Sequence, residues 1–232
     1  MIFCKKAIIW DLDNTLYRLT PEYADILDGV MAKVLVEEFG IDMTYDQAKS
    51  LVKESFKKYR DGGVLFYKEY GIDEIDFYHA YHNSVPVDYI EPYEGQPEKL
   101  QNLNIPQYIF TNSTRKLAEK ILHKIGLYDL FKDRIYSVED FDILKKNERP
   151  NVYYWLCEKI GIDAKDCIFV DDSYSNLKYP KQIGMTTVRL YYNNNSSKDL
   201  PYIDAAYNGI DNFIDAFVEE TKKCPAATSC AG

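Results

Sequence analysis

The sequence predicts an α/β fold built on an open sheet of parallel strands. Short apolar runs without polar alternation recur along the chain, and helical patterns separate them from about residue 107 onward. Such runs suit strands buried on both faces of a sheet, and regular alternation with helices favours right-handed crossovers between parallel strands. At 232 residues, the chain is expected to form one large domain, or a domain with a sizeable insertion.

Five segments have the character of buried strands, the third of them weakly: residues 7–10, 108–110, 135–136, 167–170 and 186–190. Apolar residues at helical spacing follow the second, third and fourth of these segments. Gly126, Gly161 and Gly184 end the three helices, although Pro180 weakens the prediction of the last one.

The interval between the first two strands breaks this alternation. Residues 16–103 contain no convincing strand and are too long for a crossover, and Thr20 and Thr44 each begin a helical pattern. We therefore predict an all-helical subdomain inserted after the first strand, which is called the cap below. The predicted boundaries are 1–17 and 92–220 for the α/β core, 18–91 for the cap and 221–232 for a disordered tail.

Composition excludes several classes of partner. The net charge of −9 disfavours binding to a nucleic-acid backbone, which needs a dense basic face. No apolar run approaches the ~20 residues that span a bilayer, so no membrane partner is expected. The five cysteines are odd in number and lack CxxC spacing, which favours free thiols in a reducing cytoplasm.

Acidic pairs follow the first and fourth strands. Asp11 and Asp13 come after the first, and Asp171 and Asp172 after the fourth. In extended chain, side chains two residues apart point to the same side, so Asp11 and Asp13 would point the same way. If the two strands are neighbours, four carboxylates converge at the sheet edge where open α/β folds bind ligands. Such a cluster repels itself without a cation and suits Mg²⁺; a polar turn or a helix cap is the alternative for either pair alone.

The second strand ends in a third polar segment, Thr111, Asn112 and Ser113, just before a helix. A hydroxyl and free backbone amides at a helix N-terminus can hold a phosphate group. Simple capping of the helix would use the same residues, and this segment alone does not decide between the two.

Together these segments resemble motifs of the haloacid dehalogenase superfamily. The resemblance rests on residues 11–17 (DLDNTLY), 110–113 (FTNS) and 169–176 (FVDDSYSN), and it spans about residues 5–218. It implies a Rossmann-like core with a cap inserted after the first strand. The DNTLY form of the first motif, with cap segments 66–73 and 77–81, is similar to the pyrimidine 5'-nucleotidase branch.

The resemblance implies a Mg²⁺-dependent phosphatase acting on a small phosphate monoester, foremost a nucleoside 5'-monophosphate. Asp11 would attack phosphorus and form an aspartyl-phosphate, and Asp13 would act as general acid and base. The backbone carbonyl of Asp13 would also bind the metal. A phosphatase for a sugar phosphate or another small metabolite is the first alternative, and a phosphoryl-binding protein with weak turnover is the second.

The remaining roles follow from the same resemblance. Thr111 and Asn112 would bind the phosphoryl oxygens. The implied metal ligands are Asp11, Asp13, Asp171 and Asp172. Phosphate-monoester hydrolysis is extremely slow without a catalyst, so charge neutralisation and positioning must supply most of the acceleration.

The third motif departs from the superfamily pattern. Its lysine position, counted back from the helix after Pro150, falls on Asn147. Lys146 is one residue away and Lys145 two, so a slip of the loop could supply the charge. We expect Lys146 as the catalytic lysine, with Lys145 as the second candidate, near the substrate; both could instead be solvated surface residues.

The cap contains further candidates. His79 and His82 are expected at the surface, with substrate contact as the alternative. Phe66 and Tyr67 are the cap aromatics expected nearest the substrate, where one could stack on a base, although packing is the commoner use of such residues.

Overall fold

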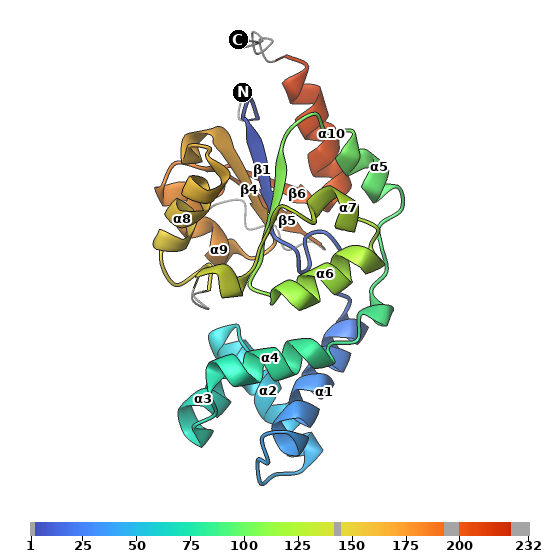
Figure 1. Cartoon of the computed structure of the whole chain (residues 1–232), viewed down its shortest axis with the longest axis vertical. Helices are drawn as coiled ribbons and strands as arrows, with labels where there is room; N and C mark the ends of the chain where they lie inside the picture. The colour runs from blue at the N-terminus through green and yellow to red at the C-terminus, as the bar shows by residue number, and fades with distance from the viewer. Residues whose placement is uncertain (1–2, 142–144, 193–199, 224–232) are drawn as a thin grey trace.

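The computed structural model describes residues 3–141, 145–192 and 200–223. It consists of an α/β core and a smaller helical cap on one side of it (Figure 1). The described residues stop at Lys223, so residues 224–232 of the predicted tail lie outside them.

The predicted parallel α/β sheet is confirmed. Its six strands are all paired in parallel in the order β3-β2-β1-β4-β5-β6. Their bounds are β1 Ala7–Trp10, β2 Gln107–Phe110, β3 Ile135–Tyr136, β4 Cys167–Asp171, β5 Thr186–Tyr191 and β6 Ala205–Asn208. The sequence did not predict β6, because this short edge strand has only half-buried or exposed side chains and its two alanines give a weak apolar signal.

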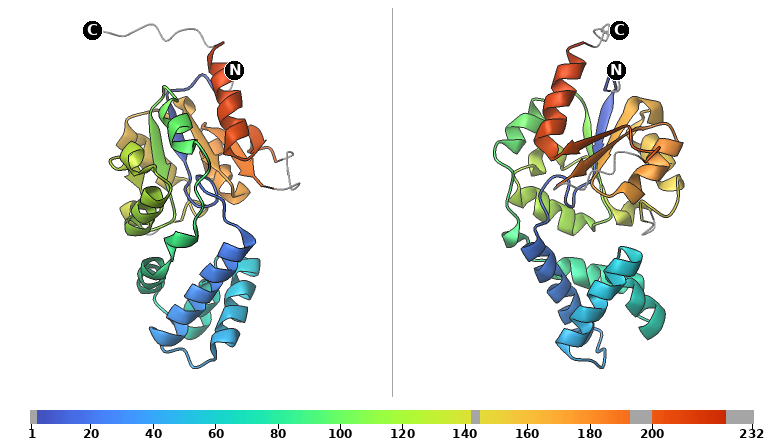
Figure 2. Two further views of the ribbon diagram at one scale, coloured as in Figure 1. Left: turned by 90° about the vertical axis from the view of Figure 1, so that its right-hand side faces the viewer. Right: turned by 180° about the vertical axis from the view of Figure 1, so that it is seen from behind.

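Helices cover both faces of the sheet and bury its strands, as Figure 2 shows from two further sides. One face packs against α5 Gln96–Gln101, α6 Arg115–Lys124, α7 Tyr128–Phe131 and α10 Ile210–Thr221. The other face packs against α8 Asn151–Ile160 and α9 Tyr174–Gln182. Alternate residues of β1 serve the two faces, with Ile8 and Trp10 on the first and Ile9 on the second.

Pro180 lies inside α9 without ending it. A proline at this position leaves the carbonyl of Asn176 without its helical donor. The hydroxyl of Tyr153, from α8, donates to that carbonyl at 2.9 Å. The bond between the two helices therefore compensates the one that proline removes.

The cap consists of α1 Pro21–Glu37, α2 Tyr45–Tyr59, α3 Val64–Tyr70 and α4 Glu74–Ser84. Thr20 caps α1 by accepting from the Tyr23 amide, and Thr44 forms the expected capping box with Gln47 at the start of α2. The cap has its own small core of Val34, Leu35, Val52, Phe66 and Phe77. It is therefore a separately packed layer on the core, placed where α4 lies against α6 (Figure 1).

Two further properties concern the described part of the chain. None of the helices in the described ranges has the length and apolar character needed to cross a bilayer. Among the described cysteines, Cys157 and Cys167 are free thiols, whereas Cys4 is disulfide-bonded. The expectation that every cysteine is a free thiol is therefore wrong for Cys4; spacing alone could not reveal a pairing made by tertiary contact.

Candidate active site

The polar segments expected at the sheet edge meet because of the strand order. β1 lies between β2 and β4, and the chain crosses to opposite sides of β1 to form them. The carboxyl ends of these three strands carry Asp11, Thr111 and Asp171. A reversal of this kind leaves a crevice at the strand ends, where open α/β folds bind their ligands.

Lys146 joins two of the buried acids. Its side chain is fully buried, and its ammonium group is paired with the carboxylate of Asp11 and, at 2.9 Å, with that of Asp171. Thr15 donates a further hydrogen bond to Asp11 at 2.9 Å. Burial lowers the pKa of Lys146, but the two carboxylates outweigh this effect and raise it, so the lysine stays charged.

Lys145 points elsewhere. Its ammonium group forms ion pairs with Asp61 and Glu74, which both belong to the cap. The two candidate lysines of the third motif are thus divided between the acid cluster and the interface of core and cap. The loop slip proposed from the sequence places Lys146, and not Lys145, beside Asp11.

The acid cluster is suited to a divalent cation. Carboxylate oxygens of Asp11, Asp171 and Asp172 lie within 4.8 Å of one another. Burial, followed by the charge of Asp171, raises the pKa of Asp11 and raises that of Asp172 to about 7. Lys146 neutralises only part of this negative charge, and oxygen ligands in excess of the nearby positive charge suit Mg²⁺. The residues present therefore fit the metal that the sequence predicted.

The carboxylate of Asp13 lies outside that cluster. It accepts hydrogen bonds from the hydroxyls of Ser113 and Tyr17, each at 2.7 Å, and from Thr111 at 3.4 Å. The expected extended geometry does not hold, because β1 ends at Trp10 and Asp13 already lies in a turn. Asp11 and Asp13 therefore face different partners, as a nucleophile and a separate acid would require.

Tyr17 is a site residue that was not predicted from the sequence. It lies in the first motif segment, is almost fully buried and donates a hydrogen bond to the carboxylate of Asp13. Its place in the first motif, four residues after Asp13, was the available signal.

Asn112 links two motifs. Its side-chain oxygen accepts a hydrogen bond from the backbone amide of Lys146 at 3.0 Å, and its own carbonyl accepts one from Tyr78 at 2.8 Å. Thr111 is fully buried, and its hydroxyl accepts from the Ser113 amide at 3.0 Å. The segment after β2 therefore has a defined shape, and phosphoryl binding by Thr111 and Asn112 remains a prediction.

Two cap residues differ from expectation. His82, which belongs to α4, is buried against the core, where its Nδ1 accepts a hydrogen bond from the backbone amide of Thr114 at 3.2 Å. The expectation of a surface position is therefore wrong for His82, while His79 is partly exposed and lies 3.6 Å from Glu139. Only the cap–core contact buries His82, which explains why the local sequence did not reveal it.

The two cap aromatics differ. Phe66 is fully buried in the small core of the cap, which corrects its expected position near the substrate. The ring of Tyr67 packs edge-on against Phe77, with centroids 5.7 Å apart, and its buried hydroxyl has no hydrogen-bond partner among the described residues. A substrate contact by Tyr67 stays a prediction.

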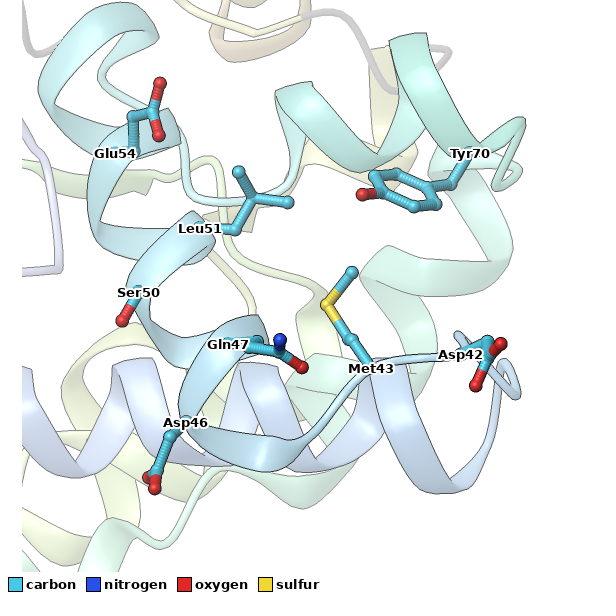
Figure 3. Close-up of a pocket in the computed structure, with 8 residues that line it drawn as sticks. All are labelled: Asp42, Met43, Asp46, Gln47, Ser50, Leu51, Glu54 and Tyr70. Carbon is cyan, nitrogen blue, oxygen red and sulfur yellow. The ribbon is translucent and has the colours of Figure 1, made fainter.

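A separate surface pocket lies within the cap, away from the motif residues (Figure 3). Its side chains include Asp42, Asp46 and Glu54 together with Met43, Leu51 and Tyr70. Three carboxylates without a lysine or arginine among the lining residues would repel a phosphate group. This pocket is therefore unsuited to a phosphorylated substrate.

Comparison with known proteins agrees with this geometry. The family described as haloacid dehalogenase-like hydrolase matches residues 5–184. Phosphate metabolism protein 8 of Saccharomyces cerevisiae is 26% identical over 194 residues, a match covering 78% of this chain but only 60% of the yeast protein. N-acetylmuramic acid 6-phosphate phosphatase of Pseudomonas aeruginosa is 24% identical over 217 residues, covering 90% of each chain.

A solved structure extends the agreement to the fold. The structure of a haloacid dehalogenase-type hydrolase of Entamoeba histolytica, described as family IA, variant 3, matches with a TM-score of 0.62. The two chains are 21% identical, and the match covers 92% of this chain and 99% of the other. At this identity, the likeness shows a shared fold for core and cap together.

Proposed function

The chain belongs to the haloacid dehalogenase-like hydrolase family, and on that premise we propose that it is a Mg²⁺-dependent phosphatase of small phosphate monoesters. One observation carries the proposal: a fully buried lysine, Lys146, holds Asp11 and Asp171 at the carboxyl end of the sheet. A lysine in this place can neutralise both an attacking carboxylate and an incoming phosphoryl group. It also argues against a binding protein without turnover.

The chemical steps fall to Asp11 and Asp13. A carboxylate oxygen of Asp11 attacks phosphorus, forming a P–O bond as the bond to the leaving alkoxide breaks. Asp13 gives its proton to that alkoxide and later takes a proton from the water that hydrolyses the aspartyl-phosphate. Bonds from Tyr17 and Ser113 hold Asp13 apart from the acid cluster, so that it can serve the leaving group.

The metal would be held by the carboxylates of Asp11, Asp171 and Asp172, with the backbone carbonyl of Asp13 as a further proposed ligand. When bound, Mg²⁺ supplies positive charge and a fixed position for a phosphoryl oxygen. Asn14 and Asn176 donate to Asp172 and Asp171, at 2.6 Å and 3.1 Å, which restricts the orientation of these ligands.

For the substrate, we propose a nucleoside 5'-monophosphate, on the resemblance of the first motif and of the cap segments 66–73 and 77–81 to pyrimidine 5'-nucleotidases. A sugar phosphate is the second candidate, favoured by the name of the Pseudomonas aeruginosa relative. Both classes have an alkoxide leaving group and need the same acid.

A substrate panel tests this proposal. Purified protein with Mg²⁺ is assayed for phosphate release from nucleoside 5'-monophosphates, sugar phosphates and a small aryl phosphate, with Asp11→Asn as the matched inactive control. We expect release that the control lacks, highest with a nucleotide. Higher kcat/KM for sugar phosphates would reassign the substrate, and phosphate binding without release would refute the phosphatase.

A further inference from the structure

One face of α4, in the cap, contacts the core segment after β2 for which phosphate binding is predicted. Tyr78 and His82 are one turn apart on this helix, with ring centroids 4.3 Å from each other. The hydroxyl of Tyr78 donates to the carbonyl of Asn112, and Nδ1 of His82 accepts from the amide of Thr114. The helix therefore holds the main chain of this segment at two points, two residues apart.

Tyr78 is connected to Asp11, the proposed nucleophile, through two further residues. Asn112, whose carbonyl accepts from Tyr78, uses its side-chain oxygen to accept from the backbone amide of Lys146. The side chain of Lys146 in turn pairs with Asp11. Three hydrogen bonds, joined through the covalent structure of Asn112 and Lys146, thus link Tyr78 of the cap to the carboxylate of Asp11. Each of these bonds is buried or partly buried, so water competes weakly for them.

We propose that Tyr78 is a positioning residue that makes the placement of Lys146 against Asp11 depend on the seating of the cap. The proposal rests on the proposed function for its effect on turnover, but the placement itself is a property of the structure. When α4 leaves the core, Asn112 loses one of its two anchors, and the amide of Lys146 loses a fixed acceptor. His82 supports the same segment from Thr114.

Amide hydrogen exchange, measured by NMR on the full chain, tests the placement without any substrate. Tyr78→Phe removes the hydroxyl and keeps the ring. We expect exchange at the amide of Lys146 to accelerate roughly fivefold, the equivalent of one typical net hydrogen bond. Tyr67→Phe is the matched control, because it removes a buried cap hydroxyl that has no partner. Equal exchange at Lys146 in Tyr78→Phe and wild type would overturn the proposal.

Kinetics with a small aryl phosphate then test this link. Tyr78→Phe should lower kcat roughly fivefold and leave KM within about twofold, because positioning acts on the transition state. In an Asn112→Ala background the same substitution should have no further effect, since the link to Lys146 is already absent. If the effects of the two substitutions on kcat multiply in the double variant, Tyr78 does not act through Asn112. A wild-type protein without turnover would refute the proposed function alone, because amide exchange still decides the positioning role.

Discussion

The acid cluster of the core and the cap–core interface both depend on lysines of the same loop, yet they differ in chemistry. Lys146 is fully buried and paired with Asp11 and Asp171. Lys145, its neighbour, is partly exposed and paired with Asp61 and Glu74 of the cap. The first region concentrates negative charge that one lysine only partly offsets. The second also holds more acid than base, with two carboxylates to one ammonium group, but its charged groups are less buried.

This difference shows that the degree of burial determines how strongly each charged side chain depends on its partners. Buried charges must be compensated by partners or a metal, and they respond strongly when one partner is removed. Ion pairs near the surface gain little, because water and salt screen them. Substitutions in the acid cluster should therefore affect chemistry strongly, whereas those in the interface should act weakly and through cap closure.

The largest expected effect is that of Asp11→Asn. The substitution keeps the size of the side chain and removes the nucleophile, so kcat should fall by at least about a thousandfold while the protein stays folded. Circular dichroism checks the fold, and phosphate release from an aryl phosphate measures kcat. Retention of more than about a hundredth of the wild-type activity would exclude Asp11 as a covalent nucleophile.

Removal of the metal should have the second-largest effect on activity. Chelation with EDTA is expected to abolish turnover, and restored Mg²⁺ should recover it. Mg²⁺ at about a hundred times its Kd should also stabilise the protein by about 2.7 kcal/mol, which thermal unfolding detects as a rise in Tm. Asp172→Asn removes one carboxylate from the cluster and should reduce the increase in Tm that Mg²⁺ produces. Full activity after exhaustive chelation would refute the metal site.

The two lysines provide the direct comparison. Lys146→Met should lower kcat roughly a hundredfold or more, because the buried cation that faces the reacting groups is lost. Lys145→Met is the matched control and should change kcat by only a few-fold, because its ammonium group pairs with Asp61 and Glu74 and not with Asp11. Steady-state kinetics measure both. A larger loss of kcat in Lys145→Met would reverse the assignment of the third motif.

The smallest expected effect is that of His82, at the contact between cap and core, on how stability depends on pH. Burial, with smaller contributions from His79 and Lys145, lowers the pKa of His82 to about 3 from 6.5. The unfolded chain therefore binds a proton between pH 6.5 and 3 that the folded protein does not, so stability is lost as the pH falls through this range. His82 should contribute a loss of about 2 kcal/mol between pH 7 and pH 5.

Urea unfolding at the two pH values measures this loss. His82→Gln, whose side-chain oxygen can still accept from the Thr114 amide, should reduce the pH dependence by about that amount. His79→Gln, at a partly exposed position, is the control and should leave it almost unchanged. An unaltered pH dependence in His82→Gln would mean that His82 is not buried in its neutral form.

Much of the fold could be predicted from the sequence because local patterns carry it. Continuous apolar runs predicted β1, β2 and β4, because strands buried on both faces tolerate few polar residues, and the β-branched residues of β5 predicted that strand. The residues that cap helices, such as Thr20 and Thr44, act within one turn of chain, so their effect is visible in the sequence. β6 escaped prediction because an edge strand needs no such run.

The sequence by itself also determined which acids follow the strands, because their position in the chain sets the sheet edge they reach. Only the tertiary structure decided where their side chains point. The turn that begins at Asp13 gives its carboxylate other partners than Asp11 has, and the path of one loop assigns Lys146 to the acids and Lys145 to the cap. Adjacent residues in a loop point in different directions, and the direction depends on contacts between segments far apart in the chain, which no local pattern encodes.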